Sequence, residues 1–201
     1  MIRIGIEGPH GVGKTSVVAR LRDSLPYAAV LPETVLERLD DVYRQFGEGT
    51  FVLNDVLRDA TCDASATYCL LDRCAASTYV YQTVEHGAAA GQTFLALADQ
   101  LVRAGLLHPP TLILVMMANP SVLETRLRRD KRPVTRDYLD RHTEGYEHLI
   151  LDTQAQSLLG RAVLLDVEDY ATLDQTAAAA QALIERECPP APATTNTYKG
   201  Q

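Results

Sequence analysis

One segment constrains the fold more than any other: residues 8–15 read Gly-Pro-His-Gly-Val-Gly-Lys-Thr and fit the pattern G-x-x-x-x-G-K-[ST]. An apolar run from Ile2 to Glu7 precedes the segment, and apolar residues with helical spacing follow it. In this strand–loop–helix context the pattern forms a phosphate-binding loop, the P-loop. Its backbone N–H groups point at phosphate oxygens, and the positive end of the following helix adds to the attraction. The sequence therefore predicts a site for a nucleoside triphosphate, with ATP and Mg²⁺ as the expected cofactors.

Individual residues of this loop have expected roles. The Lys14 ammonium should reach the β- and γ-phosphates, and the Thr15 hydroxyl should bind Mg²⁺. Asp72, at the end of a predicted strand, should orient the water shell of the metal and complete the metal site. The residues expected to bind the nucleotide are Gly8, Pro9, His10, Gly11, Val12, Gly13, Lys14, Thr15 and Ser16.

The rest of the chain alternates between apolar runs and stretches of helical periodicity. Strands are expected at 2–7, 28–31, 68–72, 111–117 and 162–166, and helices at 13–25, 34–46, 51–62, 77–86, 94–106, 120–129, 136–159 and 170–187. A Gly-Ala-Ala-Ala-Gly linker is expected at 87–91. This alternation predicts an α/β, three-layer P-loop NTPase fold: a five-stranded parallel sheet of order 2-3-1-4-5 with helices on both faces. Residues 1–187 should form one domain and residues 188–201 a disordered tail.

Composition narrows the class of partner. The 201 residues are 46% hydrophobic, which suits one domain, and a net charge of −7 argues against general binding to nucleic acid. No apolar run approaches the ~18 residues of a membrane helix, and no signal peptide is recognised. Four cysteines without metal-ligand spacing predict reduced thiols in a cytoplasmic protein. The expected partner is a small-molecule nucleoside or nucleotide, with no nucleic acid and no membrane; a homodimer is left open.

Two basic features indicate phosphoryl transfer. Arg73 follows Asp72 at a strand end, where ligands of parallel sheets bind, and we expect it to hold an acceptor phosphate. Six cations lie between Arg126 and Arg136 in an otherwise acidic chain. They predict a lid near 126–136 in which Arg128 and Arg132 bring positive charge to the transferred phosphoryl group. The alternative for this run is a solvated helix face.

Two stretches resemble thymidylate kinases, and the resemblance extends from Ile2 to Glu187. Residues 72–82, Asp-Arg-Cys-Ala-Ala-Ser-Thr-Tyr-Val-Tyr-Gln, are similar to the Asp-Arg-x-x-x-Ser-x-x-x-Tyr-Gln segment of that family. Residues 138–141, Tyr-Leu-Asp-Arg, together with Tyr146 are similar to the helix that follows its lid. The resemblance implies that the acceptor is bound by Asp72, Arg73, Ser77, Thr78, Gln82, Arg141 and, as a second acceptor-phosphate arginine, Arg58.

Two other stretches resemble viral thymidine kinases, which are deoxynucleoside kinases. Residues 8–11 are similar to their P-loop, and residues 31–33, Leu-Pro-Glu, are similar to the strand end whose glutamate removes the proton of the sugar 5′-hydroxyl. A monophosphate acceptor needs arginines such as Arg73 and Arg58, whereas a nucleoside needs a base such as Glu33. The chain carries both sets.

We therefore expect an ATP-dependent phosphotransferase with Lys14, Glu33, Arg73, Arg128 and Arg132 as its catalytic residues. The first-choice acceptor is a nucleoside monophosphate, as in thymidylate kinases. The alternative is a deoxynucleoside kinase, or an enzyme that acts on both acceptors. A P-loop ATPase or a binding module is the third choice.

Overall fold

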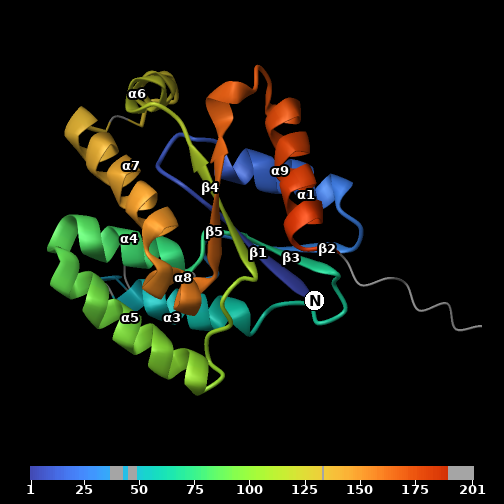
Figure 1. Ribbon diagram of the computed structural model, residues 1–201, viewed down its shortest axis with the longest axis vertical. Helices are drawn as coiled ribbons and strands as arrows, with labels where there is room; N and C mark the ends of the chain where they lie inside the picture. The colour runs from blue at the N-terminus through green and yellow to red at the C-terminus, as the bar shows by residue number, and fades with distance from the viewer. Residues whose placement is uncertain (37–42, 45–48, 133, 190–201) are drawn as a thin grey trace, which may run out of the picture.

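The computed structural model describes residues 1–36, 43–44, 49–132 and 134–189. Within these residues the strands are β1 (Ile2–Glu7), β2 (Ala28–Leu31), β3 (Tyr68–Asp72), β4 (Leu112–Met117) and β5 (Arg161–Asp166). Neighbouring strands pair in parallel in the order β2-β3-β1-β4-β5, as the sequence predicts (Figure 1).

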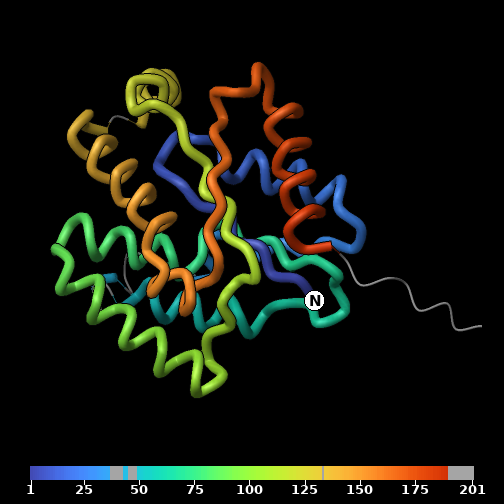
Figure 2. The backbone as a smooth tube through the Cα atoms, viewed as in Figure 1, coloured from blue at the N-terminus to red at the C-terminus, as the bar shows by residue number. Residues whose placement is uncertain are grey.

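Helices cover both faces of the sheet, which explains why its central strands are apolar without alternation. In β4, Leu112, Leu114 and Met116 enter one hydrophobic core, and the intervening residues enter the other. The first core contains α1 (Lys14–Ser24), α6 (Pro120–Arg129) and α9 (Leu173–Glu187). The second contains α4 (Ala75–His86), α5 (Ala88–Arg103) and α8 (Thr153–Leu159), while α7 (Arg136–Leu151) contributes to both cores. In the backbone trace, α1 and α9 lie on one side of the sheet and α4, α5, α7 and α8 on the other (Figure 2). The prediction of three layers is confirmed.

Several helix boundaries differ from the prediction, each for a local reason. The helix expected over 136–159 is two helices, because the Asp152 side chain accepts the N–H of Ala155 and starts α8 there. The last helix starts after Thr172, whose side chain forms a reciprocal capping box with Gln175. The expected linker at 87–91 is reduced to Gly87, since α5 already begins at Ala88.

Two further segments need correction. Residues 34–36, expected to open a helix, are not helical, and the backbone N–H of Val35 binds the Asn54 side chain instead. The remainder of that predicted helix lies largely outside the described residues. Cys188, expected in a disordered tail, is 7% exposed and packs into the first core, while residues 190–201 lie outside the described part.

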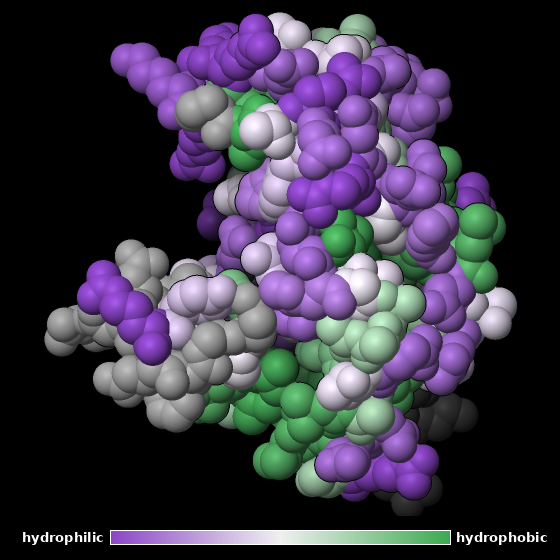
Figure 3. All heavy atoms as spheres, turned by 90° about the vertical axis from the view of Figure 1, so that its left-hand side faces the viewer, coloured by the Kyte–Doolittle hydropathy of each residue, from purple (hydrophilic) through white to green (hydrophobic). Residues whose placement is uncertain are grey.

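The surface is mainly hydrophilic on the face shown in Figure 3, and hydrophobic residues gather in the lower part of that view. The helix α3 (Gly49–Asp59) contributes exposed apolar side chains, namely Phe51, Leu53 and Leu57. None of the helices in the described part of the chain combines the length and the hydropathy that a bilayer crossing requires.

Candidate functional site

A cleft of about 460 Å³ opens at the carboxyl ends of β1, β2 and β3. Its walls come from the P-loop, from the segment after β2, and from α3, α4 and α7. The described residues that line it are Gly8, Pro9, His10, Glu33, Thr34, Phe51, Asn54, Asp55, Arg58, Arg73, Cys74, Ser77, Thr78, Tyr81, Tyr138, His142 and Tyr146. Ligands of parallel sheets bind at this edge, so the cleft lies where the topology predicts it.

The P-loop begins at a position that only glycine can occupy. Gly8 has φ +134°, and a Cβ there would lie 2.1 Å from the carbonyl oxygen of Met116. The loop ends at Gly13, which is left-handed and precedes the first turn of α1. Its backbone thus curls ahead of a helix N-terminus, the arrangement that binds phosphate.

Lys14 fills the space inside this loop. Its Nζ donates to the carbonyl oxygens of Gly8 at 2.8 Å and Pro9 at 2.9 Å. Burial, followed by the charge of Arg73, lowers the pKa of Lys14 to about 7. An anionic phosphate at this position would replace both carbonyl contacts and restore the positive charge.

Glu33 and Arg73 meet at the mouth of the cleft. Arg73 Nε lies 2.7 Å from Glu33 Oε1, an ion-pair contact without hydrogen-bond alignment. The Glu33 side chain is 58% exposed, whereas that of Arg73 is 15% exposed. Arg73 is also held by Ser77 and Tyr146, because its Nη1 lies 3.1 Å from Ser77 Oγ and 3.3 Å from Tyr146 Oη.

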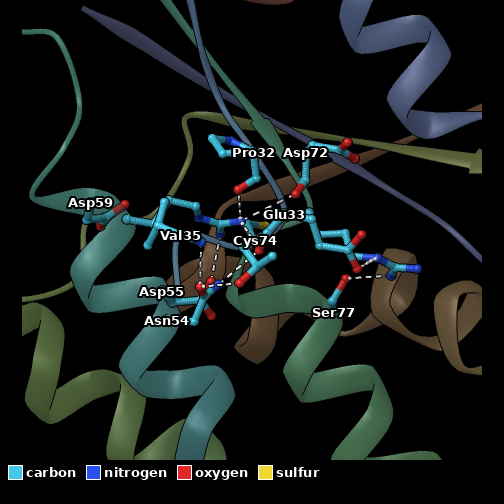
Figure 4. Close-up of polar contacts among 12 residues, drawn as sticks. Pro32, Glu33, Val35, Asn54, Asp55, Asp59, Asp72, Cys74 and Ser77 are labelled. Carbon is cyan, nitrogen blue, oxygen red and sulfur yellow. Dashed lines mark hydrogen bonds and ion pairs between the residues drawn. The ribbon is translucent and has the colours of Figure 1, made fainter. Parts of the chain in front are cut away.

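The polar residues of α3 hold the segment after β2 in place. Asn54 accepts the N–H of Val35 and donates to the carbonyl of Glu33, both at 2.9 Å (Figure 4). Arg58 donates to the carbonyls of Pro32, Glu33 and Asp72 and pairs with Asp55 at 2.7 Å. Burial raises the pKa of Asp55 to about 7, although Arg58 acts to lower it. Arg58 is only 2% exposed, and both of its Nη groups are engaged by the protein itself.

Aromatic rings form a wall of the cleft that reaches from α3 to the P-loop. Their centroids follow one another from Phe51 to Tyr81 at 6.4 Å, to His142 at 6.0 Å, to Tyr138 at 4.0 Å and to His10 at 5.8 Å. Desolvation, followed by the charge of Arg73, lowers the pKa of His10 to about 3, so its ring is neutral at pH 7. A flat, aromatic ligand such as a nucleobase can stack against this wall.

Several residues expected at the site lie outside the described lining of the cleft. They are Asp72, the P-loop residues 11–16, Gln82, Arg128, Arg132 and Arg141. Gln82 is on α4, but the residues of α4 that line the cleft are Ser77, Thr78 and Tyr81, together with the N-cap Cys74. Arg141 pairs with Asp137 at 3.0 Å and with Glu85 at 3.2 Å. Arg128 pairs with Glu124 and its side chain is 74% exposed. Arg132 is exposed in the turn after α6, where its charge still acts on His10.

The residues expected to hold Mg²⁺ fit a hard cation. Asp72 is 5% exposed, and its Oδ1 is buried without a hydrogen-bond partner among the described residues. Thr15 presents an exposed hydroxyl-bearing side chain in the first turn of α1. Carboxylate and hydroxyl oxygens at the edge of a phosphate loop are the donor set that Mg²⁺ prefers beside nucleotide phosphates.

Apart from Arg58, the residues that α3 contributes to the site were not predicted from the sequence. Buried Thr50, Asn54, Asp55 and Arg58 line the inner side of this helix, while Leu53 and Leu57 are exposed. A signal was available, since Thr50, Asn54 and Arg58 recur every four residues and therefore share one face. Apolar residues usually mark the inner face of a helix, whereas in α3 the polar stripe faces inward.

Comparison with known proteins yields a likeness in structure only. The sequence matches no protein-family model and no curated protein. Among solved structures, a deoxyadenosine kinase from M. mycoides with the products dCMP and a flexible dCDP bound aligns over 92% of this chain and 99% of its own, with a TM-score of 0.64 and 13% identity. The deoxyadenosine kinase from M. mycoides with bound dATP aligns over 92% and 100%, with a TM-score of 0.65 and 12% identity. These values show a shared fold.

Proposed function

We propose that the protein is an ATP-dependent deoxynucleoside kinase that transfers the γ-phosphate to the 5′-hydroxyl of its substrate. The P-loop supports a nucleoside triphosphate as donor. The aromatic wall supports a nucleoside as acceptor, and the shared fold with two deoxyadenosine kinase structures agrees with both.

The ion pair of Glu33 and Arg73 is the observation that favours a nucleoside over a monophosphate as the acceptor. Arg58 and Arg73 are the arginines among the described lining residues, and both are already paired. A monophosphate acceptor would have to displace Glu33 from Arg73, and Arg58 could bind it only by leaving Asp55 and the three carbonyls that it contacts. A nucleoside needs neither arginine, because its hydroxyl is neutral. This reverses the order of the two acceptors expected from sequence.

In this proposal Glu33 removes the proton of the substrate 5′-hydroxyl as the hydroxyl oxygen bonds to the γ-phosphorus. The bond from that phosphorus to the bridging oxygen of the β-phosphate breaks, and ADP leaves. Arg73 holds the Glu33 carboxylate at the mouth of the cleft. Lys14 leaves the carbonyls of Gly8 and Pro9 and neutralises charge on the β- and γ-phosphates. Mg²⁺, held through Thr15 and Asp72, would neutralise further phosphate charge.

An acceptor screen tests the proposal. Purified protein with ATP and Mg²⁺ is given each deoxynucleoside and each deoxynucleoside monophosphate, and ADP formation is measured. We expect turnover with at least one deoxynucleoside. Glu33→Gln should lower kcat by about 10²- to 10⁴-fold, the usual effect of removing a general base. Glu144→Gln, the same change at an exposed position of α7, is the matched control.

A monophosphate kinase of thymidylate type is the second candidate, because Arg73, Ser77 and Thr78 of the resembling segment do line the cleft. This second candidate predicts the opposite order of the two acceptors and of the two variants. Turnover of dTMP without turnover of any deoxynucleoside, together with a larger loss in Arg73→Ala than in Glu33→Gln, would replace the proposed function by this one.

A further inference from the structure

A buried carboxylate lies behind the cleft and does not line it. Glu7 ends β1 and has no exposed surface. It accepts the backbone N–H of Cys74 at 2.6 Å, the Ser77 hydroxyl at 2.5 Å and the Tyr146 hydroxyl at 3.1 Å. A buried carboxylate without partners would be costly, so these donors hold Glu7 in a defined position.

The same two hydroxyls also contact Arg73. Ser77 Oγ and Tyr146 Oη lie 3.2 Å apart, and each is within 3.3 Å of Arg73 Nη1. Burial, followed by the charge of Glu7, raises the pKa of Tyr146, so its hydroxyl keeps its proton. The hydroxyls therefore bridge the negative Glu7 and the positive Arg73.

The backbone at Arg73 also depends on Glu7. Arg73 has φ +68°, a left-handed conformation that is unfavourable for a residue with a side chain. Its N–H donates to Ile6, and the next N–H, that of Cys74, donates to the Glu7 carboxylate. Cys74 is the N-cap of α4 and makes no side-chain cap, so Glu7 supplies the negative group at this helix end.

We infer that Glu7 is a positioning residue that holds Arg73, and through Arg73 the Glu33 carboxylate, in the geometry for proton removal. The chain of contacts runs from Glu7 through Ser77 and Tyr146 to Arg73 and ends at Glu33 in the cleft. This inference rests on the proposed function, since it assigns Glu33 the role of base. Glu7 itself never touches substrate.

Kinetics of Glu7→Gln test the inference, because glutamine keeps the size of the side chain and removes its charge. Loss of a charge-assisted contact to the positioning network should lower kcat about 10- to 100-fold. KM for ATP and for the deoxynucleoside should stay within threefold, since Glu7 lies outside the cleft. An unchanged kcat, or a fall in kcat/KM that comes from a higher KM alone, overturns the inference.

A double-mutant cycle asks whether the effect passes through Arg73. In an Arg73→Ala background Glu7→Gln should have no further effect on kcat, because the residue it positions is gone. An equal fall in both backgrounds overturns the inference. Asp59→Asn is the matched control: Asp59 is another buried carboxylate, paired with Arg3 away from the cleft, and its loss should lower stability while kcat is retained.

A spectroscopic measurement separates this inference from the proposed function. In ¹H–¹⁵N spectra the Nε–H signal of Arg73, assigned by its absence in Arg73→Lys, should be sharp in the wild type and broadened in Glu7→Gln. A wild type that phosphorylates no deoxynucleoside overturns the proposed function and with it the base role, while the signal still shows whether Glu7 holds Arg73. An active wild type whose Arg73 signal does not change in Glu7→Gln overturns the inference alone.

Discussion

Burial and neighbouring charges change the pKa values of single residues at this site, and Lys14 is the clearest case. Its ammonium is buried and contacts two carbonyl oxygens. Burial and the nearby charge of Arg73 both lower its pKa. A base with a lowered pKa binds protons less readily in the folded chain than in the unfolded one. Unfolding therefore takes up a proton between the folded pKa of about 7 and the unfolded pKa of 10.5, and the contribution of Lys14 to stability rises with pH in that range.

The same shift predicts proton uptake when ATP binds. Phosphate oxygens favour the charged form, so the pKa of Lys14 should rise on binding from about 7. At pH 8 the lysine then takes up a proton, and ATP affinity should fall about tenfold per pH unit above 7. Calorimetry in two buffers of different ionisation enthalpy measures the uptake. Binding with no buffer dependence at pH 8 would contradict it.

Replacing the lysine separates catalysis from folding. Lys14→Met should abolish turnover, because the phosphates lose their principal cation inside the loop. The melting temperature at pH 7.5 should not fall, since a buried amine with a lowered pKa is itself a cost to the fold. Thermal melting and ADP release test the two halves. Retained turnover in a well-folded variant would remove Lys14 from its assigned role.

At the scale of elements, the sequence was most informative where periodicity and burial agree. The strands followed from apolar runs such as Leu112–Met117, whose two faces are both buried. The P-loop followed from its motif, and the strand order from the rule of right-handed crossovers. The predicted helix boundaries were wrong at Asp152 and Thr172, where a single side-chain cap decides the start of a helix. The role of Arg58 could not be predicted, because only the fold shows that three carbonyls surround it.

Replacing Arg58 of α3 distinguishes a structural role for this arginine from a role in binding substrate. Arg58→Met leaves Asp55 buried without its partner, which should cost about 3–5 kcal/mol in the free energy of unfolding. Adding Asp55→Asn should recover part of that loss. Urea unfolding measures both variants. If Arg58 instead bound an acceptor phosphate, Arg58→Met would raise KM for a monophosphate and leave the unfolding midpoint unchanged.

At the scale of the whole molecule, the P-loop is in contact with both helices that flank the predicted lid. A Cβ at Gly11 would lie 2.8 Å from Leu127 of α6, and the His10 ring lies 5.8 Å from Tyr138 of α7. Between these helices Lys131 adopts φ +57°, which marks a tight turn. A ligand that orders the loop therefore acts on α6 and α7 through packed contacts.

The lid prediction follows from this packing and from the exposed arginines of α6. When ATP and a deoxynucleoside bind together, the phosphates attract Arg128 and Arg132, and hydrogen exchange should slow in peptides covering Arg126–Arg132 and Thr135–Tyr138. Peptides from β4, buried on both faces, should change little and serve as the internal control. Lys14→Met should abolish the added protection, because the phosphates are no longer held. Equal and strong protection with and without both ligands would show that this segment is a fixed, solvated helix face rather than a lid.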